Sequence, residues 1–497
     1  MIALVRINSE FNRKRIPPLG LLYVGDALKK KGYDVKIFHC TPNEIKKYSK
    51  IIVKKDPMFV GFSVITGNQT KFSAEMSKEI KNRGDVPVVW GGPHPTLLPK
   101  QCLEEDYIDI VVHGEGEETS AELARTLEKR RDLNKVRSIG YKDKKNNIRL
   151  TGQRPLIENI DKFKLDWDLI DVRDYLSSEP LWGCKRVLAH VTSRGCPFNC
   201  AFCYNLIFNR RRWRCHSKEH IISDIEFLKS EFGIDGIKYS DDNFFINRKR
   251  SLEIAKAVNL PWHADININF ITRQYIKKLA ETNVKAFLLG AESGSNRILN
   301  LINKGITAGD IIKCCKIVSK FPEIHAKYSF ILGVPTETWV ETQKTIDVIL
   351  RLHDIDPKSS YTVGPYLPYP GTPFYDLAIK HGFTPPERTE DWHVLDRWEA
   401  KLDLTWLPWA DKNVFLLIRD YSRFLYLGTH YNIPLISRLA YFRLAKKKFS
   451  FPIDHKIIKF GFGKFRAMVY KPKGSFEKLV QNVILNKKSR RTRQKHI

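Results

Sequence analysis

Short apolar runs alternate with amphipathic stretches along the first 130 residues. The runs are rich in β-branched residues and too short for helices, and they stand at Ile2–Ile7, Val35–Phe38, Phe59–Val64, Val86–Trp90 and Ile108–Val112. Helically spaced apolar residues lie between them, at Leu19–Lys31, Asn68–Asn82 and Glu117–Lys129. Five buried strands separated by helices predict an α/β fold, a doubly wound parallel sheet that binds its ligand at the carboxyl ends of the strands.

A second alternating series lies between residues 185 and 375. Strands are predicted at Val187–Thr192, Gly236–Ser240, Trp262–Ile268, Ala286–Gly290, Ala326–Leu332 and Ser360–Pro365, with helices such as Ser217–Glu231 and Thr307–Lys320 between them. Six strand–helix units predict a partial (β/α)6 barrel. Parallel barrels carry their chemistry at the carboxyl ends of the strands.

The pattern divides the chain into four segments. Residues 1–130 form the first sheet domain, and residues 131–184 form a connector with a hairpin tip near Lys142–Asn147. Residues 185–375 form the half-barrel. Residues 376–497 are expected to be mainly helical, with a helix over Asn413–Leu427, and match no motif.

Three cysteines, Cys196, Cys200 and Cys203, fall within eight residues directly after the first predicted barrel strand. Their C-x3-C-x2-C spacing can bind three irons of a cubane cluster and leave the fourth iron open. A structural zinc site would need a fourth ligand, and the nearest candidates, Cys215 and His216, follow Cys203 by twelve residues or more. A zinc knuckle or three buried thiols remain the alternatives.

This triplet, with the aromatic Phe202 before its third cysteine, resembles the cluster motif of radical S-adenosylmethionine enzymes. The resemblance implies a [4Fe-4S] cluster whose open iron chelates the methionine end of S-adenosylmethionine. The run Gly290-Ala-Glu-Ser-Gly-Ser295 resembles the fourth-strand motif of the cobalamin-dependent members, and Tyr369-Pro-Gly-Thr-Pro373 resembles their sixth-strand loop. By this resemblance the contacts to S-adenosylmethionine are expected from Phe202, Asp242, Glu292, Ser293 and Arg297.

Two glycine-containing loops follow the fourth and fifth strands of the first domain. Neither is a G-x-G-x-x-G nucleotide fingerprint, and together they resemble the cobalamin-binding domain of the same enzymes. The implied cobalamin contacts are Ser63, Gly91, Gly92, His94, Gly114, Glu115 and Gly116. Because Asn8–Arg15 contains no histidine, cobalt would lack a lower axial imidazole, and His94 would contact the cofactor's periphery. A flavodoxin-like module without a ligand remains the alternative.

Composition favours an intracellular enzyme. Nine cysteines in no regular disulfide spacing indicate a reducing cytoplasm, and no signal peptide or transmembrane segment is evident. From Arg438 to the end, eighteen Lys and Arg face only two acidic residues, a local net of +16 out of +29 for the chain. This basic region suits an anionic membrane surface; a plain solvated face is equally compatible. The last stretch, Lys487–Lys495, is expected to be disordered. We see no RNA-binding module, so nucleic acid is not expected.

The resemblance implies a methyltransferase that acts through a 5′-deoxyadenosyl radical and cobalamin on an unactivated carbon, or on phosphorus, of a small-molecule or lipid-linked substrate. It also implies an electron donor of the flavodoxin or ferredoxin type. Three alternatives stay open: an oxidative cyclase or ring-rearranging enzyme, a tRNA-modifying methylthiotransferase, and a non-enzymatic cobalamin sensor or carrier. The methylthiotransferase would need a second cysteine triplet upstream, which the chain lacks.

Overall fold

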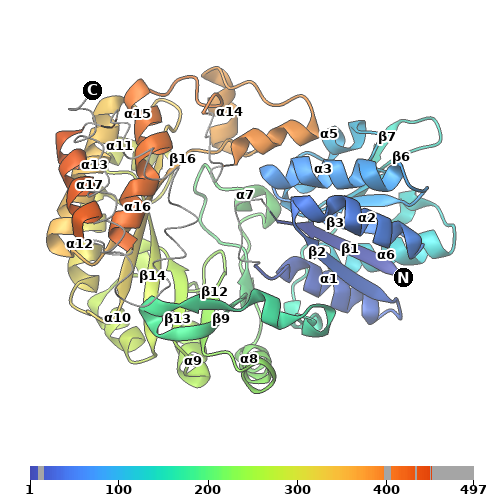
Figure 1. Ribbon diagram of the computed structural model, residues 1–497, viewed down its shortest axis with the longest axis horizontal. Coiled ribbons are helices and arrows are strands. Elements are labelled where there is room, and N and C mark those ends of the chain that lie inside the picture. The colour runs from blue at the N-terminus through green and yellow to red at the C-terminus, as the bar shows by residue number, and fades with distance from the viewer. Residues whose placement is uncertain (9–15, 397–403, 431–433, 448, 450–497) are drawn as a thin grey trace, which may run out of the picture.

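The computed structural model describes the chain except residues 9–15, 397–403, 431–433, 448 and 450–497 (Figure 1). The predicted terminal disorder and most of the basic region therefore lie outside the described residues. The first sheet has the order β2-β1-β3-β4-β5-β6-β7. Its strands are β1 (Ile2–Ile7), β2 (Val35–Cys40), β3 (Val60–Ser63), β4 (Val88–Gly91), β5 (Ile110–Val112), β6 (Ile139–Lys142) and β7 (Ile148–Leu150).

The first five strands are parallel, which confirms the doubly wound sheet. The helices of this domain are α1 (Leu19–Lys29), α2 (Ile45–Lys54), α3 (Asn68–Lys81), α4 (Pro93–Leu97), α5 (Pro99–Glu104) and α6 (Glu117–Glu128). Alternate residues of β1 belong to two separate apolar cores: Ala3 and Val5 pack with α2 and α3, whereas Ile2 and Leu4 pack with α1 and α6. The hairpin β6–β7 is antiparallel and extends this sheet at its edge.

The second sheet is the half-barrel, with the order β16-β15-β14-β13-β12-β9-β8. The strands are β8 (Ser177–Glu179), β9 (Cys184–His190), β12 (Gly236–Tyr239), β13 (Trp262–Ile266), β14 (Val284–Glu292), β15 (His325–Leu332) and β16 (Ser360–Pro365). All pair in parallel except the edge strand β8. The six predicted strands are confirmed, and the consecutive order is that of a barrel wall that does not close.

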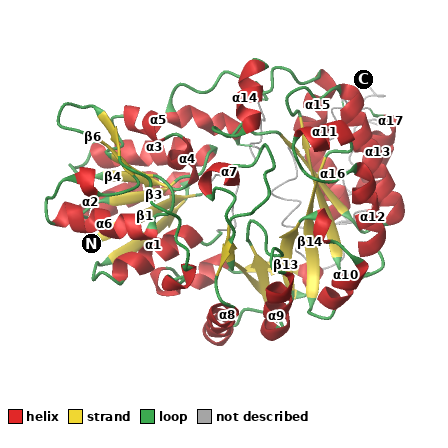
Figure 2. Cartoon of the chain, turned by 180° about the vertical axis from the view of Figure 1, so that it is seen from behind, coloured by secondary structure: helices red, strands yellow, loops and turns green. Residues whose placement is uncertain are grey.

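Helices cover the outer face of the half-barrel (Figure 2). They include α8 (Lys218–Phe232), α9 (Arg248–Val258), α10 (Arg273–Ala280), α11 (Asn296–Leu301), α12 (Ala308–Val318) and α13 (Trp339–Ile355). The helix α14 (Pro373–Lys380) instead begins where the amide of Phe374 donates to the carbonyl oxygen of Ala201. Burial alternates along β15, whose buried residues Ala326, Tyr328 and Phe330 belong to the common core. Side-chain caps from Ser217, Thr307 and Thr338 begin α8, α12 and α13, because each accepts a hydrogen bond from an otherwise unpaired backbone amide.

The segment after the barrel first returns to the sheet domain and then covers β16. A 3₁₀ helix, Thr389–Leu395, packs against α3, and the Trp392 indole donates to Gln101 Oε1 at 2.7 Å. The chain then forms α15 (Lys412–Leu416), a π-helical turn (Leu417–Tyr421), α16 (Ser422–His430) and α17 (Pro434–Lys446). The predicted helical character of Asn413–Leu427 is confirmed, with a π-turn inside it.

Candidate active site

The three predicted cluster cysteines lie in the loop that follows β9 and the short strand β10 (Ser193–Arg194) and leads into α7 (Asn205–Phe208). All three are free thiols and partly exposed. Gly195 precedes them with φ of 82°. A Cβ there would lie 2.1 Å from the Arg212 carbonyl oxygen, so the tight entry into this loop requires glycine.

The spacing of the three thiols suits a multi-iron group, in which each thiolate binds a different iron. Burial raises the pKa of each thiol, to about 12 for Cys203. Iron binding must therefore drive their deprotonation.

The loop after β12 holds the cysteine loop in place. Asp241 is buried and accepts hydrogen bonds from Thr192 N and Oγ1, both at 2.7 Å. Asp242 Oδ2 accepts one from Gly195 N at 2.8 Å, and its carboxylate also bonds the Tyr204 hydroxyl, whose pKa it raises. The predicted residue Asp242 thus lies directly against the cysteine loop.

Glu292, another predicted residue, lies at an irregular end of β14. The pairing with β15 shifts between Gly290 and Glu292, and Glu292 has φ of 61°, a conformation that costs of order 1–3 kcal/mol for a non-glycine residue. Its Oε1 is 2.6 Å from Lys304 Nζ, and both side chains are 9% exposed. A Cβ at Gly290 would lie 2.4 Å from Glu292 Oε1, so glycine makes room for this pair.

Lys304 stays charged next to the thiols. Burial would lower its pKa, but Glu292 and Cys200 outweigh burial, and the pKa lies above its ordinary value. The ammonium in turn opposes the rise in the pKa of Cys196 and Cys200. Asn243 Nδ2 donates a long hydrogen bond to Cys196 Sγ, at 3.9 Å. The Lys304 ammonium and the Asn243 amide therefore lie beside the thiols, and both suit a cluster that carries negative charge.

The other residues predicted to contact S-adenosylmethionine have different surroundings. Phe202 is partly buried against the barrel core. Ser293 Oγ lies 3.3 Å from Thr345 Oγ1, and Arg297 forms a two-bond ion pair with Glu341, both bonds 2.7 Å long. Thr345 and Glu341 belong to α13. The structure thus brings Asp242 and Glu292 to the thiol loop and places Ser293 and Arg297 against α13.

The predicted cobalamin residues lie together at the carboxyl ends of β3, β4 and β5. Ser63 and Gly91 are register partners in the pairing of β3 with β4. Gly92 has φ of 96°, and a Cβ there would lie 3.0 Å from the Val64 carbonyl oxygen. His94 is fully buried; its Nδ1 lies 3.1 Å from Thr66 Oγ1, while its Nε2 has no hydrogen-bond partner among the described residues.

In the loop after β5, Gly114 borders free space and Glu115 forms ion pairs with two arginines. A Cβ added at Gly114, with φ of 88°, would meet nothing within 4 Å, and Gly116 caps α6. Glu115 between them bonds Arg194, Arg214 and the amide of Ile157. Open space at Gly114 and an unpaired polar atom at His94 fit a large polar ligand at these strand ends. Glu115 instead joins the sheet domain to the half-barrel.

The cysteine loop and the loops that carry the predicted cobalamin residues face each other where the half-barrel meets the sheet domain, which we call the joint. The helix α4, which carries His94, packs against α7, which follows the cluster cysteines. Four residues of this region were not assigned from the sequence: Arg194, Tyr204, Asn243 and Lys304. For Lys304 a signal existed, because it follows Glu292 by twelve residues in the same motif region. The other three have partners in distant segments.

Two family models match separate parts of the chain. A family model described as B12 binding domain matches residues 13–124, and one described as Radical SAM superfamily matches residues 190–349. The second match contains the three cysteines, and the first contains the glycine loops. The radical-enzyme motif and the cobalamin domain expected from the sequence are confirmed.

Relatives and solved structures span both domains. An uncharacterized methyltransferase, PH0819, of Pyrococcus horikoshii is 36% identical over 73% of this chain and 78% of its own length. The anaerobic magnesium-protoporphyrin IX monomethyl ester cyclase of Cereibacter sphaeroides is 27% identical over 71% of this chain and 59% of its own length. The radical S-adenosylmethionine methyltransferase TsrM of Kitasatospora setae, solved with cobalamin and a [4Fe-4S] cluster, shares the fold with a TM-score of 0.61, at 16% identity over 77% of this chain and 75% of its own.

These matches indicate three cofactors: a [4Fe-4S] cluster, S-adenosylmethionine and cobalamin. The residues of the thiol loop and of the strand ends fit these groups. The chain belongs to the cobalamin-binding family of radical S-adenosylmethionine enzymes, and its relatives place it among the methyltransferases of that family.

Proposed function

We propose that the enzyme transfers a methyl group to an unactivated carbon, or to phosphorus, of a small-molecule or lipid-like substrate bound between the thiol loop and the glycine loops of the sheet domain. The observation that carries this proposal is the packing of α4 on α7 together with the ion pair of Glu115 with Arg194. A substrate held near this joint is within reach of both cofactor sites. When bound, the cluster with S-adenosylmethionine supplies a carbon radical, and cobalamin supplies the methyl group.

The chain's own residues bind and orient these groups. Cys196, Cys200 and Cys203 hold three irons. The Lys304 ammonium balances negative charge beside them, and its pair with Glu292 fixes where that charge lies. Among the residues proposed for S-adenosylmethionine, Asp242 and Glu292 have the strongest support, because both border the thiol loop. Phe202, Ser293 and Arg297 remain part of the proposed set, with Ser293 and Arg297 acting from the side of α13.

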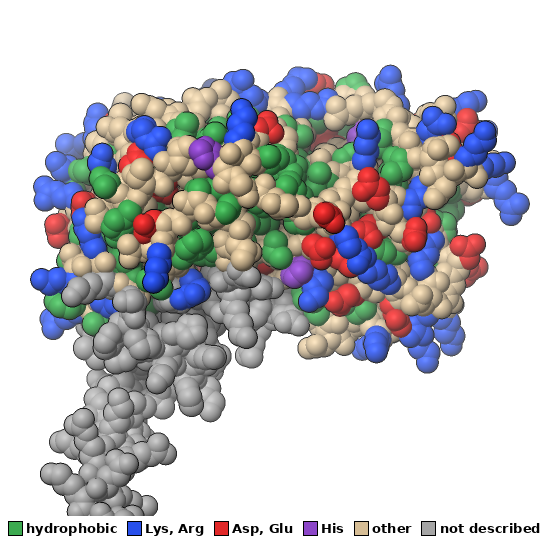
Figure 3. Space-filling view, turned by 90° about the horizontal axis from the view of Figure 1, so that it is seen from above, with side chains coloured by type: hydrophobic (Ala, Val, Ile, Leu, Met, Phe, Trp, Pro, Cys, Tyr) green, Lys and Arg blue, Asp and Glu red, His purple; other side chains and the backbone are tan. Residues whose placement is uncertain are grey.

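We also propose a flavodoxin or ferredoxin as electron donor, because cleavage of S-adenosylmethionine requires a reduced cluster. None of the helices in the described part of the chain combines the length and the apolar run that a membrane crossing needs. Figure 3 shows Lys and Arg interspersed with Asp and Glu over one face of the described residues. We propose a cytoplasmic enzyme whose basic residues 438–497 contact the anionic inner face of the membrane.

The test of methyl transfer uses the anaerobic full-length enzyme with cobalamin, a reductant and S-adenosylmethionine labelled in its methyl group. Candidate acceptors are offered singly, and the products are analysed by mass spectrometry. We expect 5′-deoxyadenosine, S-adenosylhomocysteine and a labelled acceptor to appear together. Formation of 5′-deoxyadenosine with an oxidised, unlabelled product would contradict methyl transfer.

That contrary result would support the second candidate, an oxidative cyclase. The similarity to the Cereibacter sphaeroides cyclase favours it, since it extends over 71% of this chain. The two activities differ in the fate of the label, because ring closure leaves the methyl group of S-adenosylmethionine in methionine.

A further inference from the structure

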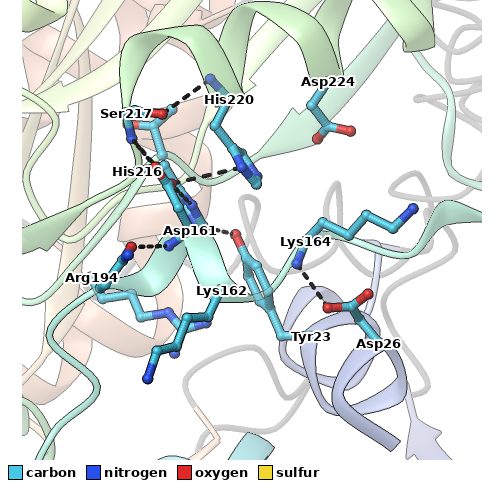
Figure 4. Close-up of polar contacts among 12 residues, drawn as sticks. Tyr23, Asp26, Asp161, Lys162, Lys164, Arg194, His216, Ser217, His220 and Asp224 are labelled. Atoms are coloured by element: carbon cyan, nitrogen blue, oxygen red, sulfur yellow. Dashed lines mark hydrogen bonds and ion pairs between the residues drawn. The ribbon is translucent and has the colours of Figure 1, made fainter. Parts of the chain in front are cut away.

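Two histidines and an aspartate lie close together at a second position in the joint between the domains (Figure 4). Asp161 is in a short 3₁₀ helix of the connector, Ile160–Lys162. His216 stands before α8, and His220 lies in its first turn. One ligand atom from each of the three residues lies within 4.8 Å of the others.

The distances between these ligand atoms are near those found around a single ion. Asp161 Oδ1 is 2.8 Å from His216 Nδ1 and 3.7 Å from His220 Nδ1. The second distance is too long for a hydrogen bond. Two ligand atoms on a tetrahedral zinc with bonds of about 2.0–2.1 Å are about 3.4 Å apart. The Asp161–His220 separation is close to that value, and the Asp161–His216 separation would need to lengthen by about 0.6 Å.

The two imidazole rings are stacked, with centroids 4.4 Å apart and an interplanar angle of 18°. Stacking places both Nδ1 atoms on the side of Asp161. Hydrogen bonds to Tyr23 and Asp161 explain the position of the His216 ring. They do not explain the position of the His220 ring, which takes no part in them. A shared ion explains why the His220 ring lies parallel to that of His216 and beside the same carboxylate oxygen.

Neighbouring residues form hydrogen bonds to His216 and Asp161, as residues around metal ligands usually do. The Tyr23 hydroxyl lies 2.8 Å from His216 Nε2, so the far nitrogen of the buried imidazole has an oxygen partner, as ligating histidines usually have. The Ser217 amide lies 3.1 Å from both oxygens of Asp161 and orients this carboxylate. These contacts come from α1, the connector and the start of α8.

We propose that Asp161, His216 and His220 bind a divalent first-row cation, for which Zn²⁺ is the probe, with water in the fourth position. Two imidazoles and one carboxylate form a donor set that such ions accept. The ion ties the connector to α8 and, through Tyr23, to the sheet domain. This site is separate from the cluster cysteines, and its occupation does not depend on the proposed methyl transfer.

The test is calorimetric titration of Zn²⁺ into the anaerobic, cluster-loaded full chain. The variant is His220→Ala, because this side chain is partly exposed and not part of the core. The matched control is His381→Ala, an exposed histidine at the end of α14. We expect the wild type and the control to bind one zinc per chain more than His220→Ala does, with equal iron content in all three proteins.

A second variant and a thermal measurement distinguish loss of zinc binding from misfolding. Asp161→Asn keeps the size of the side chain and should also lose the additional zinc. Zinc should raise the thermal midpoint of the wild type and of His381→Ala, without raising that of His220→Ala. Equal zinc stoichiometry in the wild type and His220→Ala would overturn the proposal, as would failure of the wild type to bind zinc at all.

Discussion

The Glu115 carboxylate lies 2.9 Å from the guanidinium of Arg194, which stands two residues before the first cluster cysteine. Both side chains are largely buried, at 6% and 16% exposure. Burial would raise the pKa of Glu115, but Arg194 and Arg214 outweigh burial and hold that pKa below its ordinary value. The loop that borders the cobalamin site is therefore joined, by a buried ion pair, to the strand that leads into the thiol loop.

Replacing Glu115 by Gln should destabilise this joint. The change leaves Arg214, which is 4% exposed, without its charged partner, and breaking a buried pair in this way costs about 3–5 kcal/mol. Urea unfolding of the full chain measures the effect as a lower midpoint. The matched control is Glu158→Gln: Glu158 pairs with Arg212 at 2.8 Å, but both side chains are more than half exposed. That pair should contribute about 0–1 kcal/mol; equal losses in both variants would contradict a special role for Glu115.

Replacing Lys304 by Met should lower the reduction potential of the cluster. The Lys304 ammonium is buried and opposes the rise that burial causes in the pKa of Cys196 and Cys200, so its charge acts on the cluster ligands. Loss of a nearby cation disfavours the added electron. Redox titration followed by electron paramagnetic resonance measures the shift, with Lys320→Met, an exposed change after α12, as control. An unchanged potential in Lys304→Met would show that the ammonium lies too far from the cluster.

Replacing His94 by Gln should leave the cobalt spectrum of bound cobalamin largely unchanged. Burial lowers the pKa of His94 to about 3, its Nδ1 is close to Thr66 Oγ1, and its ring packs edge-on against Trp392 at 5.9 Å. We therefore expect base-off cobalamin without imidazole on cobalt. His113→Gln, a partly buried change in the neighbouring loop, is the control. Nitrogen hyperfine structure in the Co(II) spectrum that disappears in His94→Gln alone would prove the account wrong.

The basic region should bind the enzyme to anionic vesicles. Each Lys or Arg near such a surface contributes roughly 1 kcal/mol, and salt weakens the attraction over a screening length of about 8 Å. The comparison is between the full chain and one that ends after Phe449, which is buried against Tyr421; a chain that ends near Ile436 would lose α17 as well. The full chain alone should sediment with anionic vesicles and be released by high salt. If both chains stay in solution, the case for membrane contact fails.

The strands were predictable because local composition decides them. Runs such as Ile2–Ile7 and Ala326–Leu332 are short, apolar and β-branched, and no helix of that length would be stable alone. The cysteine motif was predictable for the same reason, since its spacing is local. The membership of β6 and β7 in the first sheet was not, because pairing of Ile110 with Tyr141 depends on a contact between distant segments.

Side-chain partners were the least predictable part of the site. Arg297 was expected near S-adenosylmethionine from its place in a motif, but its guanidinium pairs with Glu341, 44 residues further along the chain. Glu341 is also the acidic member of the capping box that begins α13. The same carboxylate therefore pairs with Arg297 and accepts the hydrogen bonds of Thr338. Glu115 was expected near cobalamin and pairs with Arg194, 79 residues away. Loop sequences show which residues follow a strand, whereas ion pairs depend on how two domains meet.

The central claim is that Cys196, Cys200 and Cys203 hold the cluster that cleaves S-adenosylmethionine. The most direct measurement is 5′-deoxyadenosine formation by the anaerobically reconstituted enzyme and by the three single Cys→Ala variants. Cys215→Ala, which removes another partly exposed free thiol, is the control. We expect about four irons per chain and 5′-deoxyadenosine in the wild type and in Cys215→Ala, and no 5′-deoxyadenosine in the other three. Product formation by any one of the Cys196, Cys200 or Cys203 variants would contradict the account.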